Sequence, residues 1–151
     1  MKTLLAPLCA ATSLLGCGPA AEAPQIIVEN AVMTAPALPG GPGAAYFTLR
    51  TNVGPSRLVS VTSPSTRTIE LHQTREEGGR TSMVPLDAGG ATFSPGRPLV
   101  FAPGGKHAML IDVAPGLVPG GKVRLTFNVD PAPPVTVEAE VRGPGQAHAQ
   151  H

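Results

Sequence analysis

The chain has 151 residues, a formal net charge of +1, 14% charged residues and 3% aromatic residues. This length suits one domain with a modest core. The near-neutral charge and the scarcity of aromatic side chains exclude an extended nucleic-acid interface, which needs a basic surface and stacking partners for bases. The 18 Gly and 18 Pro disfavour long helices, and the 42% hydrophobic fraction favours packed strands over disorder.

The N-terminal stretch MKTLLAPLCAATSLLGC has the pattern of an export signal. A single lysine precedes an apolar run that is too short to span a bilayer as a permanent helix. The run ends in LLGC, which resembles a bacterial lipobox, where the cysteine is acylated and becomes the new N-terminus. We predict a lipoprotein signal peptide over residues 1–16, lipidation of Cys17 and a tether over residues 17–24. A plain secretory signal cleaved near Ala20 or Ala23 is the alternative.

The lipobox also predicts where the protein resides and how its cysteines are used. The chain has two cysteines, Cys9 in the signal and Cys17 at the lipidation site. We therefore predict a periplasmic protein, attached to the membrane through its lipid anchor only, whose mature domain carries no free thiol and no disulfide. A blue-copper centre is excluded, because it requires a cysteine thiolate.

After the signal, apolar and polar residues alternate in a series of short segments separated by Gly- and Pro-rich turns. The predicted strands cover residues 26–33, 44–50, 57–61, 68–72, 83–86, 98–102, 107–113, 122–129 and 135–141. Short strands with turns at roughly ten-residue spacing are typical of an all-β Greek-key sandwich or barrel. We predict one such domain over residues 25–142, with a disordered His-containing tail over residues 143–151. Residues 73–82 and 87–97 are predicted to be connecting loops.

Alternation also assigns the core. Side chains two positions apart on a strand share one face. The predicted core therefore includes Val123, Leu125, Phe127 and Val129; Val135, Val137, Ala139 and Val141; Ala45, Phe47 and Leu49; and Met33. These are packing positions without a chemical role.

Histidine and methionine are the residues most able to carry chemistry. His72 ends a predicted strand and Met83 follows across a charged, Gly-rich segment. His107 and Met109 lie two positions apart after a glycine turn, so they should point the same way. A hairpin returning to Met83 and a Greek-key neighbour carrying His107 could bring these residues to one rim. His148 and His151 lie in the predicted tail.

Two imidazoles and two thioethers would suit Cu(I), because thioether sulfur is soft and neutral and is a poor ligand for Zn, Mg or Ca. The residues alone leave simpler interpretations open. A single His at a strand end is usually a surface or hydrogen-bonded residue, and a single Met on a strand is usually core filler. Glu70 is expected to be a solvated strand position. No nucleophile elbow or paired carboxylates indicate an enzyme.

Three stretches, AAYFTLRTNVGPSRLVSVTSP, IELH and FAPGGKHAML, resemble the periplasmic copper chaperone family PCu(A)C over roughly residues 26–142. The motif of that family is H-x10-M-x21-H-x-M. Ten residues separate His72 from Met83, as in the motif, and His107-Ala108-Met109 matches its last element. The spacing between Met83 and His107 is 23 residues, two more than the motif.

The resemblance implies a cupredoxin-like β-sandwich that binds one Cu(I) near its surface through His72, Met83, His107 and Met109. It further implies a non-enzymatic metallochaperone that delivers copper to envelope cuproproteins such as the Cu(A) subunit of cytochrome c oxidase. Gln73 departs from the family, because many members carry Met at that position. The alternative function is a structural or interaction β-sandwich lipoprotein that does not use copper.

Overall fold

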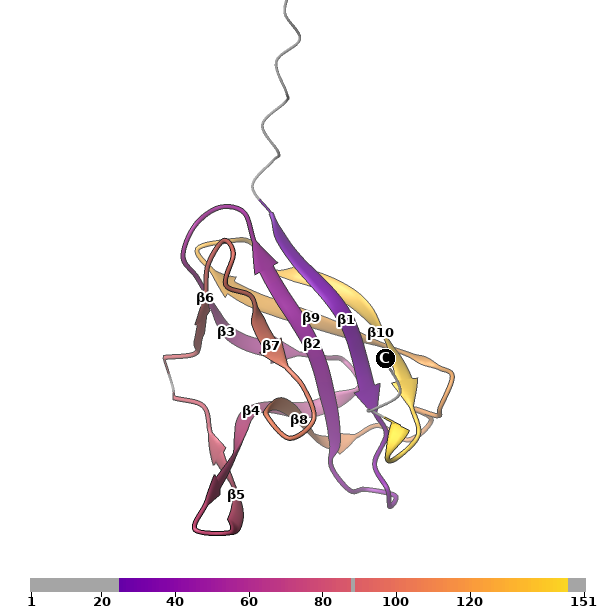
Figure 1. Cartoon of the computed structure of the whole chain (residues 1–151). Coiled ribbons are helices and arrows are strands. Elements are labelled where there is room, and N and C mark those ends of the chain that lie inside the picture. The colour runs from indigo at the N-terminus through magenta and orange to yellow at the C-terminus, as the bar shows by residue number, and fades with distance from the viewer. Residues whose placement is uncertain (1–24, 88, 147–151) are drawn as a thin grey trace, which may run out of the picture.

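The computed structural model describes residues 25–87 and 89–146, and this part of the chain is all-β (Figure 1). The ten strands in chain order are β1 (Ile26–Thr34), β2 (Gly43–Thr51), β3 (Ser56–Thr62), β4 (Thr66–Glu77), β5 (Arg80–Pro85), β6 (Ala91–Phe93), β7 (Leu99–Phe101), β8 (Lys106–Val113), β9 (Lys122–Asp130) and β10 (Val135–Arg142). The prediction of an all-β fold without helices is confirmed for the described residues.

The strands form one continuous hydrogen-bonded sheet that encloses the core. Its order is β5-β4-β8-β2-β1-β10-β9-β3-β6, and β7 pairs with β2. The pairing of β1 with β10 is parallel, whereas the other named pairs are antiparallel. Neighbours that are far apart in sequence, such as β2 and β8, show the crossover connections expected of a Greek-key arrangement.

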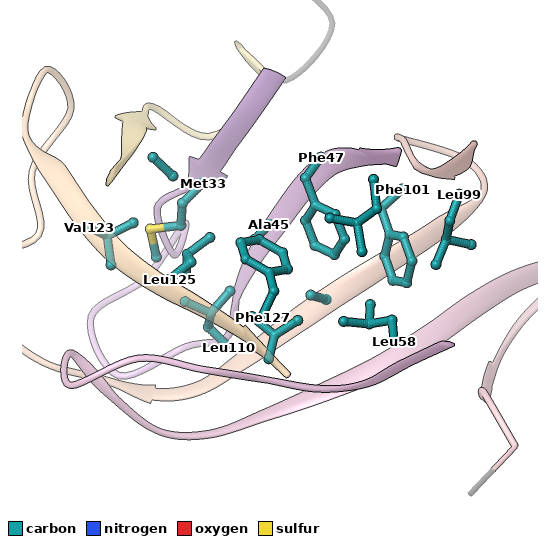
Figure 2. Packing of buried hydrophobic residues seen from close by; sticks show 14 of the residues in the cluster. Met33, Ala45, Phe47, Leu58, Leu99, Phe101, Leu110, Val123, Leu125 and Phe127 are labelled. Atoms are coloured by element: carbon teal, nitrogen blue, oxygen red, sulfur yellow. The ribbon is translucent and has the colours of Figure 1, made fainter. Parts of the chain in front are cut away.

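The core lies between strands from both halves of this order. The Phe47 ring of β2 stacks on Phe101 of β7, with ring centroids 4.4 Å apart, and meets the edge of Phe127 of β9 at 4.7 Å. Figure 2 shows these rings with Leu58 and Leu125 in the same apolar layer. Alternation predicted this face correctly for β2 and β9. Met33, which was predicted to be core, is fully buried (0% exposed).

Two segments that were predicted to be loops contain strands. Residues 73–82 form the outer part of a hairpin, because β4 continues to Glu77 and β5 begins at Arg80. Gly78 and Gly79 both have positive φ angles, 58° and 75°. This is the backbone that a two-residue hairpin turn requires, and glycine adopts it without a steric penalty. The hairpin extends away from the rest of the sheet (Figure 1).

The second correction concerns residues 87–97, where β6 pairs with β3. Ala91 and Phe93 are buried in the core, so three residues suffice to make this strand. The glycines on either side of it hid the short alternating segment from sequence reasoning.

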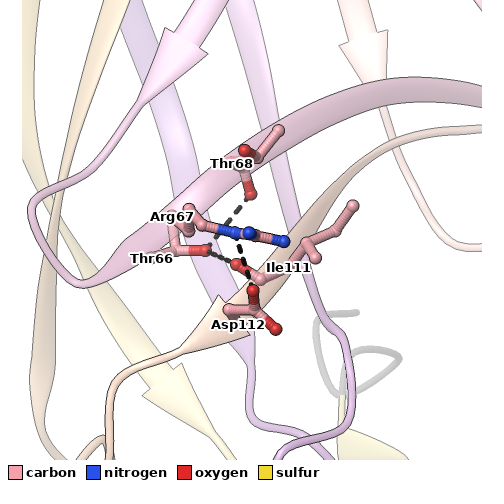
Figure 3. Close-up of polar contacts among 5 residues, drawn as sticks. All are labelled: Thr66, Arg67, Thr68, Ile111 and Asp112. Carbon is pink, nitrogen blue, oxygen red and sulfur yellow. Dashed lines mark hydrogen bonds and ion pairs between the residues drawn. The ribbon is translucent and has the colours of Figure 1, made fainter.

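The β4–β8 ladder is the pairing that positions the histidines. At its far end, the Arg67 guanidinium lies 2.7 Å from the Asp112 carboxylate, and the Thr66 hydroxyl donates to the carbonyl oxygen of Ile111 (Figure 3). Asp112 has a φ of 54°, a backbone that Asp adopts more readily than most residues. These contacts join the two strands at one end, and the histidines lie at the other.

Candidate metal centre

His72 of β4 and His107 of β8 are direct cross-strand partners. Antiparallel partners project to the same face of a sheet, so the two imidazoles lie side by side. Their ring centroids are 5.8 Å apart and the planes are tilted by 43°. Both residues are nearly buried, at 9% exposure each. This pairing joins two residues that are widely separated in the sequence.

Met109 lies on the same face as His107, as the two-residue spacing predicts. Its cross-strand partners are Glu70 of β4 and Ala44 of β2, and its side chain is partly buried. The alternate residues of β8, Ala108 and Leu110, are fully buried in the core. Met109 therefore belongs to the outer face of the sheet, where His107 also lies.

Met83 reaches this face from the hairpin. It pairs with Thr74, which is two residues beyond His72 and so shares the face of His72. The residue directly opposite His72 on β5 is Pro85, so Met83 is one step further out along the hairpin. Its side chain is 61% exposed. The register thus gives all four predicted residues one face, with Met83 at its open edge.

Two adjoining hollows divide these residues. A cavity of about 450 Å³ is lined by Met83, His107 and Met109, together with Thr74 and Tyr46. His72 lines the neighbouring hollow, of about 370 Å³, with Glu70 and Pro85. The two hollows share no lining residue, but His107 of the first and His72 of the second have ring centroids only 5.8 Å apart. Three of the predicted residues therefore share one open cavity, and His72 lines a separate hollow beside its cross-strand partner His107.

Hydrogen bonds orient both imidazoles. His72 Nε2 lies 3.0 Å from Glu70 Oε2, and His72 Nδ1 is buried without a hydrogen-bond partner among the described residues. His107 Nδ1 lies 3.3 Å from the carbonyl oxygen of Gly105. A carboxylate and a carbonyl can only accept, so in neutral imidazoles the hydrogens are assigned to His72 Nε2 and His107 Nδ1. Each imidazole ring then keeps one nitrogen lone pair that is available to a metal ion.

The donor set fits a soft monovalent cation. It combines two imidazole nitrogens with two thioether sulfurs, and the sulfurs are neutral and polarisable. Within residues 25–87 and 89–146, no three His, Cys, Asp or Glu side chains gather as a harder divalent ion would require. The Nδ1 of His72 is a buried acceptor that has no partner among the residues that the structure describes, and a bound cation would supply one.

Sequence reasoning missed two residues around this face. Glu70 was expected to be only solvated, but its carboxylate bonds His72 although its side chain is 47% exposed. Tyr46 lines the cavity, and burial of its phenol raises its pKa above 10.0. The alternation of β2 could have indicated Tyr46, because it is the sequence neighbour of the buried Phe47 and therefore lies on the opposite face of the strand. Nothing in the sequence signalled the Glu70 contact beyond its two-residue spacing from His72.

Other predicted features lie at or beyond the limits of the described chain. Cys17, His148 and His151 fall outside the described residues. The first part of the predicted tail is described, and there Pro144 and Gly145 line the cavity of His107 and Met109. Of the described residues, none belongs to a helix long and apolar enough to cross a membrane.

Comparison with known families gives one match. A family model described as "LpqE-like: Putative lipoprotein LpqE-like" matches residues 26–141. No curated protein matches the sequence at a significant level.

Solved structures give a consistent result. The apo PCuAC domain of PmoF2 is 25% identical, with a TM-score of 0.64, covering 82% of this chain and 94% of that one. The solution structure of apo-DR1885 from Deinococcus radiodurans is 26% identical (TM-score 0.57), covering 95% and 99% of the two chains. The Cu(I) form of DR1885 is 26% identical (TM-score 0.53), covering 76% and 78%. The predicted resemblance to PCu(A)C proteins and the cupredoxin-like fold are confirmed.

Proposed function

The chain belongs to the LpqE-like family, and from this membership and the His–Met face we propose that it is a Cu(I)-binding metallochaperone. The proposed ligands are His72, Met83, His107 and Met109. The observation that carries the proposal is the β4–β8 register, in which His72 opposes His107. The β4–β5 and β4–β8 pairings give both methionines the same face. The similarity to a Cu(I)-loaded solved structure supports copper in this oxidation state.

The distribution of exposure suits transfer of the ion better than permanent storage. The two imidazoles are nearly buried, whereas Met83 is 61% exposed at the open edge of the cavity. A ligand from an acceptor protein can therefore displace Met83 first, while the histidines still hold the ion. Copper is the cargo in this scheme, and the protein performs no bond-breaking reaction. We therefore assign it as a carrier and not as an enzyme.

The cellular setting forms the second part of the proposal. Lipidation of Cys17 after removal of residues 1–16 would anchor the domain of residues 25–142 through the tether of residues 17–24. The family description, which names a lipoprotein, supports this arrangement. The copper would then be delivered on the periplasmic side of the membrane to an envelope cuproprotein. The Cu(A) subunit of cytochrome c oxidase is the proposed recipient.

The test of copper binding is a Cu(I) titration against a chromophoric chelator, under reducing and anaerobic conditions, with the chain lacking residues 1–24. A second chain that also lacks residues 147–151 removes His148 and His151 but keeps Pro144 and Gly145 at the cavity. We expect one tight equivalent in both chains. Zn(II) should compete poorly, because thioethers are weak ligands for it.

Two outcomes contradict this assignment. Loss of the tight equivalent with residues 147–151 would move the site to the tail histidines. Absence of tight binding in both chains would favour the alternative function, a structural or interaction lipoprotein. The double variant His107→Ala/Met109→Ala provides the specificity test, because it should abolish binding while the fold, monitored by circular dichroism, persists. The matched control is Met33→Leu, which removes a sulfur from the core.

A further inference from the structure

The carboxylate of Glu70 contacts one of the proposed ligands, His72, although Glu70 is not itself a proposed ligand. Its Oε2 lies 3.0 Å from His72 Nε2, and both residues belong to β4. They are two positions apart, so they project to the same face. Across the β4–β8 ladder, Glu70 opposes Met109, and His72 opposes His107. The carboxylate therefore contacts one proposed ligand, His72, and Glu70 is the cross-strand partner of a second, Met109.

The two nitrogens of His72 have unequal surroundings. Nε2 has the Glu70 carboxylate as its partner, whereas Nδ1 is buried and has no partner among the described residues. A neutral imidazole has one N–H and one lone pair. A carboxylate accepts only, so the contact with Glu70 favours the hydrogen on Nε2. The lone pair is then left on Nδ1, where the described part of the chain offers it no donor.

We propose that Glu70 is a positioning residue, which holds His72 in its Nε2–H form and so presents the Nδ1 lone pair to Cu(I). The inference rests on the proposed copper function. A ligating histidine is generally oriented by a hydrogen bond from its other nitrogen, and a carboxylate partner also increases the basicity of the ligating nitrogen. Because Glu70 is also the cross-strand partner of Met109, its negative charge would favour a cation held by His72 and Met109.

The first experiment measures the tautomer without copper. A long-range 1H–15N correlation spectrum of the full mature domain at about pH 8, where an ordinary imidazole is neutral, identifies which nitrogen of His72 carries the hydrogen. We expect Nε2–H in the wild type and a mixture of both forms in Glu70→Ala. Glu70→Gln should give a smaller share of Nε2–H than the wild type, because its amide can accept through the oxygen or donate through the nitrogen. A wild-type spectrum with the hydrogen on Nδ1, or an unchanged spectrum in Glu70→Ala, would overturn the proposal.

The second experiment measures Cu(I) affinity in the same variants. Glu70→Ala should weaken binding about 10- to 100-fold, the range found when hydrogen-bond partners of metal-ligating residues are removed. Glu70→Gln should lose less than Glu70→Ala, because its amide oxygen can still accept the hydrogen bond from Nε2. The matched control is Glu138→Ala, which removes an exposed strand glutamate that pairs with Lys122 in β9. This control should bind as the wild type does.

The two failures are distinguishable. If the wild type binds Cu(I) tightly and Glu70→Ala binds equally well, the role of Glu70 is wrong and the copper function stands. If the wild type binds no Cu(I), the copper function itself is wrong, whatever the tautomer of His72. Thermal unfolding of each variant shows whether a loss of affinity comes from a loss of folded protein.

Discussion

The imidazoles of His72 and His107 lie side by side on one face of the β4–β8 ladder, with ring centroids 5.8 Å apart. Bonds between a metal and an imidazole nitrogen are about 2 Å long. A single ion between the rings could therefore contact one nitrogen of each after small side-chain rotations. The strands supply this proximity through backbone pairing, so the two imidazoles are already close together before any ion binds.

Met109 should contribute more to Cu(I) affinity than Met83 does. Met109 is partly buried on the central strand β8, whereas Met83 is 61% exposed on the projecting hairpin. Less conformational entropy is lost when an ion binds a side chain that packing already holds. We expect both Met109→Leu and Met83→Leu to weaken binding, with the larger loss for Met109→Leu, as measured by chelator competition.

Met33→Leu is the control for this comparison, because Leu is close to Met in volume and the Met33 side chain is fully buried. It should leave copper affinity unchanged. If Met109→Leu, Met83→Leu and Met33→Leu all bound Cu(I) as tightly as the wild type, thioether sulfur would not take part in binding.

The hairpin turn should influence copper binding only through Met83. Gly78 and Gly79 have positive φ angles, and replacing both with Ala costs about 1–2 kcal/mol per residue in this conformation. We expect the Ala-Ala variant to weaken Cu(I) binding about as much as Met83→Leu, because the hairpin that carries the sulfur is destabilised. Affinity is again measured by chelator competition.

A double-mutant cycle tests the route of this effect. Adding Met83→Leu to the Ala-Ala turn should cause little further loss, since both changes remove the same contribution. Fully additive losses would mean that the turn acts on the histidines as well. The control is Gly78→Asn, which makes an Asn-Gly turn. Asn tolerates the left-handed backbone, so this variant should bind Cu(I) as the wild type does.

The sequence predicted the architecture well where one face of a strand is buried. On β9, Val123, Leu125 and Phe127 alternate with polar residues and are buried, because the pleat sends successive side chains to opposite faces. The sequence did not predict the strand residues that bury little apolar surface. The end of β4, TREE, is polar on both faces because the hairpin projects into solvent, so no alternation marks it.

One part of the candidate site could be predicted from the sequence, because strand geometry determines which nearby residues share a face. The spacing of His107 and Met109 follows from strand geometry, and the register bears out their common face. The pairing of His72 with His107 depends on which strands become neighbours, and local patterns do not encode that choice. The division of the four proposed ligands between two hollows depends on side-chain packing across three strands, which alternation does not describe.

Gly90→Ala should destabilise the fold strongly. Gly90 has a φ of 79°, and an added Cβ would lie 2.2 Å from the carbonyl oxygen of Leu58, which is backbone and cannot rotate away. We expect a loss of about 1–3 kcal/mol in the free energy of unfolding, from backbone strain and displacement of β6 from β3. Denaturant unfolding monitored by circular dichroism measures it.

The neighbouring glycine provides a matched control for this substitution. A Cβ at Gly89 would meet nothing within 4 Å, and Gly89 has no positive φ. Gly89→Ala should therefore change the free energy of unfolding by less than about 0.5 kcal/mol. If the two substitutions had equal effects, the close approach of Gly90 to Leu58 would be unimportant for stability.

Tyr46 should make the protein less stable at alkaline pH. Burial raises the pKa of its phenol above the ordinary 10.0, because the charged phenolate would be poorly solvated there. The unfolded chain ionises near 10.0, so above that pH the folded state binds more protons and the free energy of unfolding falls as pH rises. The contribution is fully present below pH 10 and is lost as the pH passes through the folded-state pKa.

Since the chain has one Tyr and no Trp, the ultraviolet absorbance of tyrosinate reports this group alone. We expect a titration midpoint above 10.0 and a smaller alkaline loss of stability in Tyr46→Phe. A midpoint at or below 10.0 would contradict burial of the phenol beside the cavity of His107 and Met109.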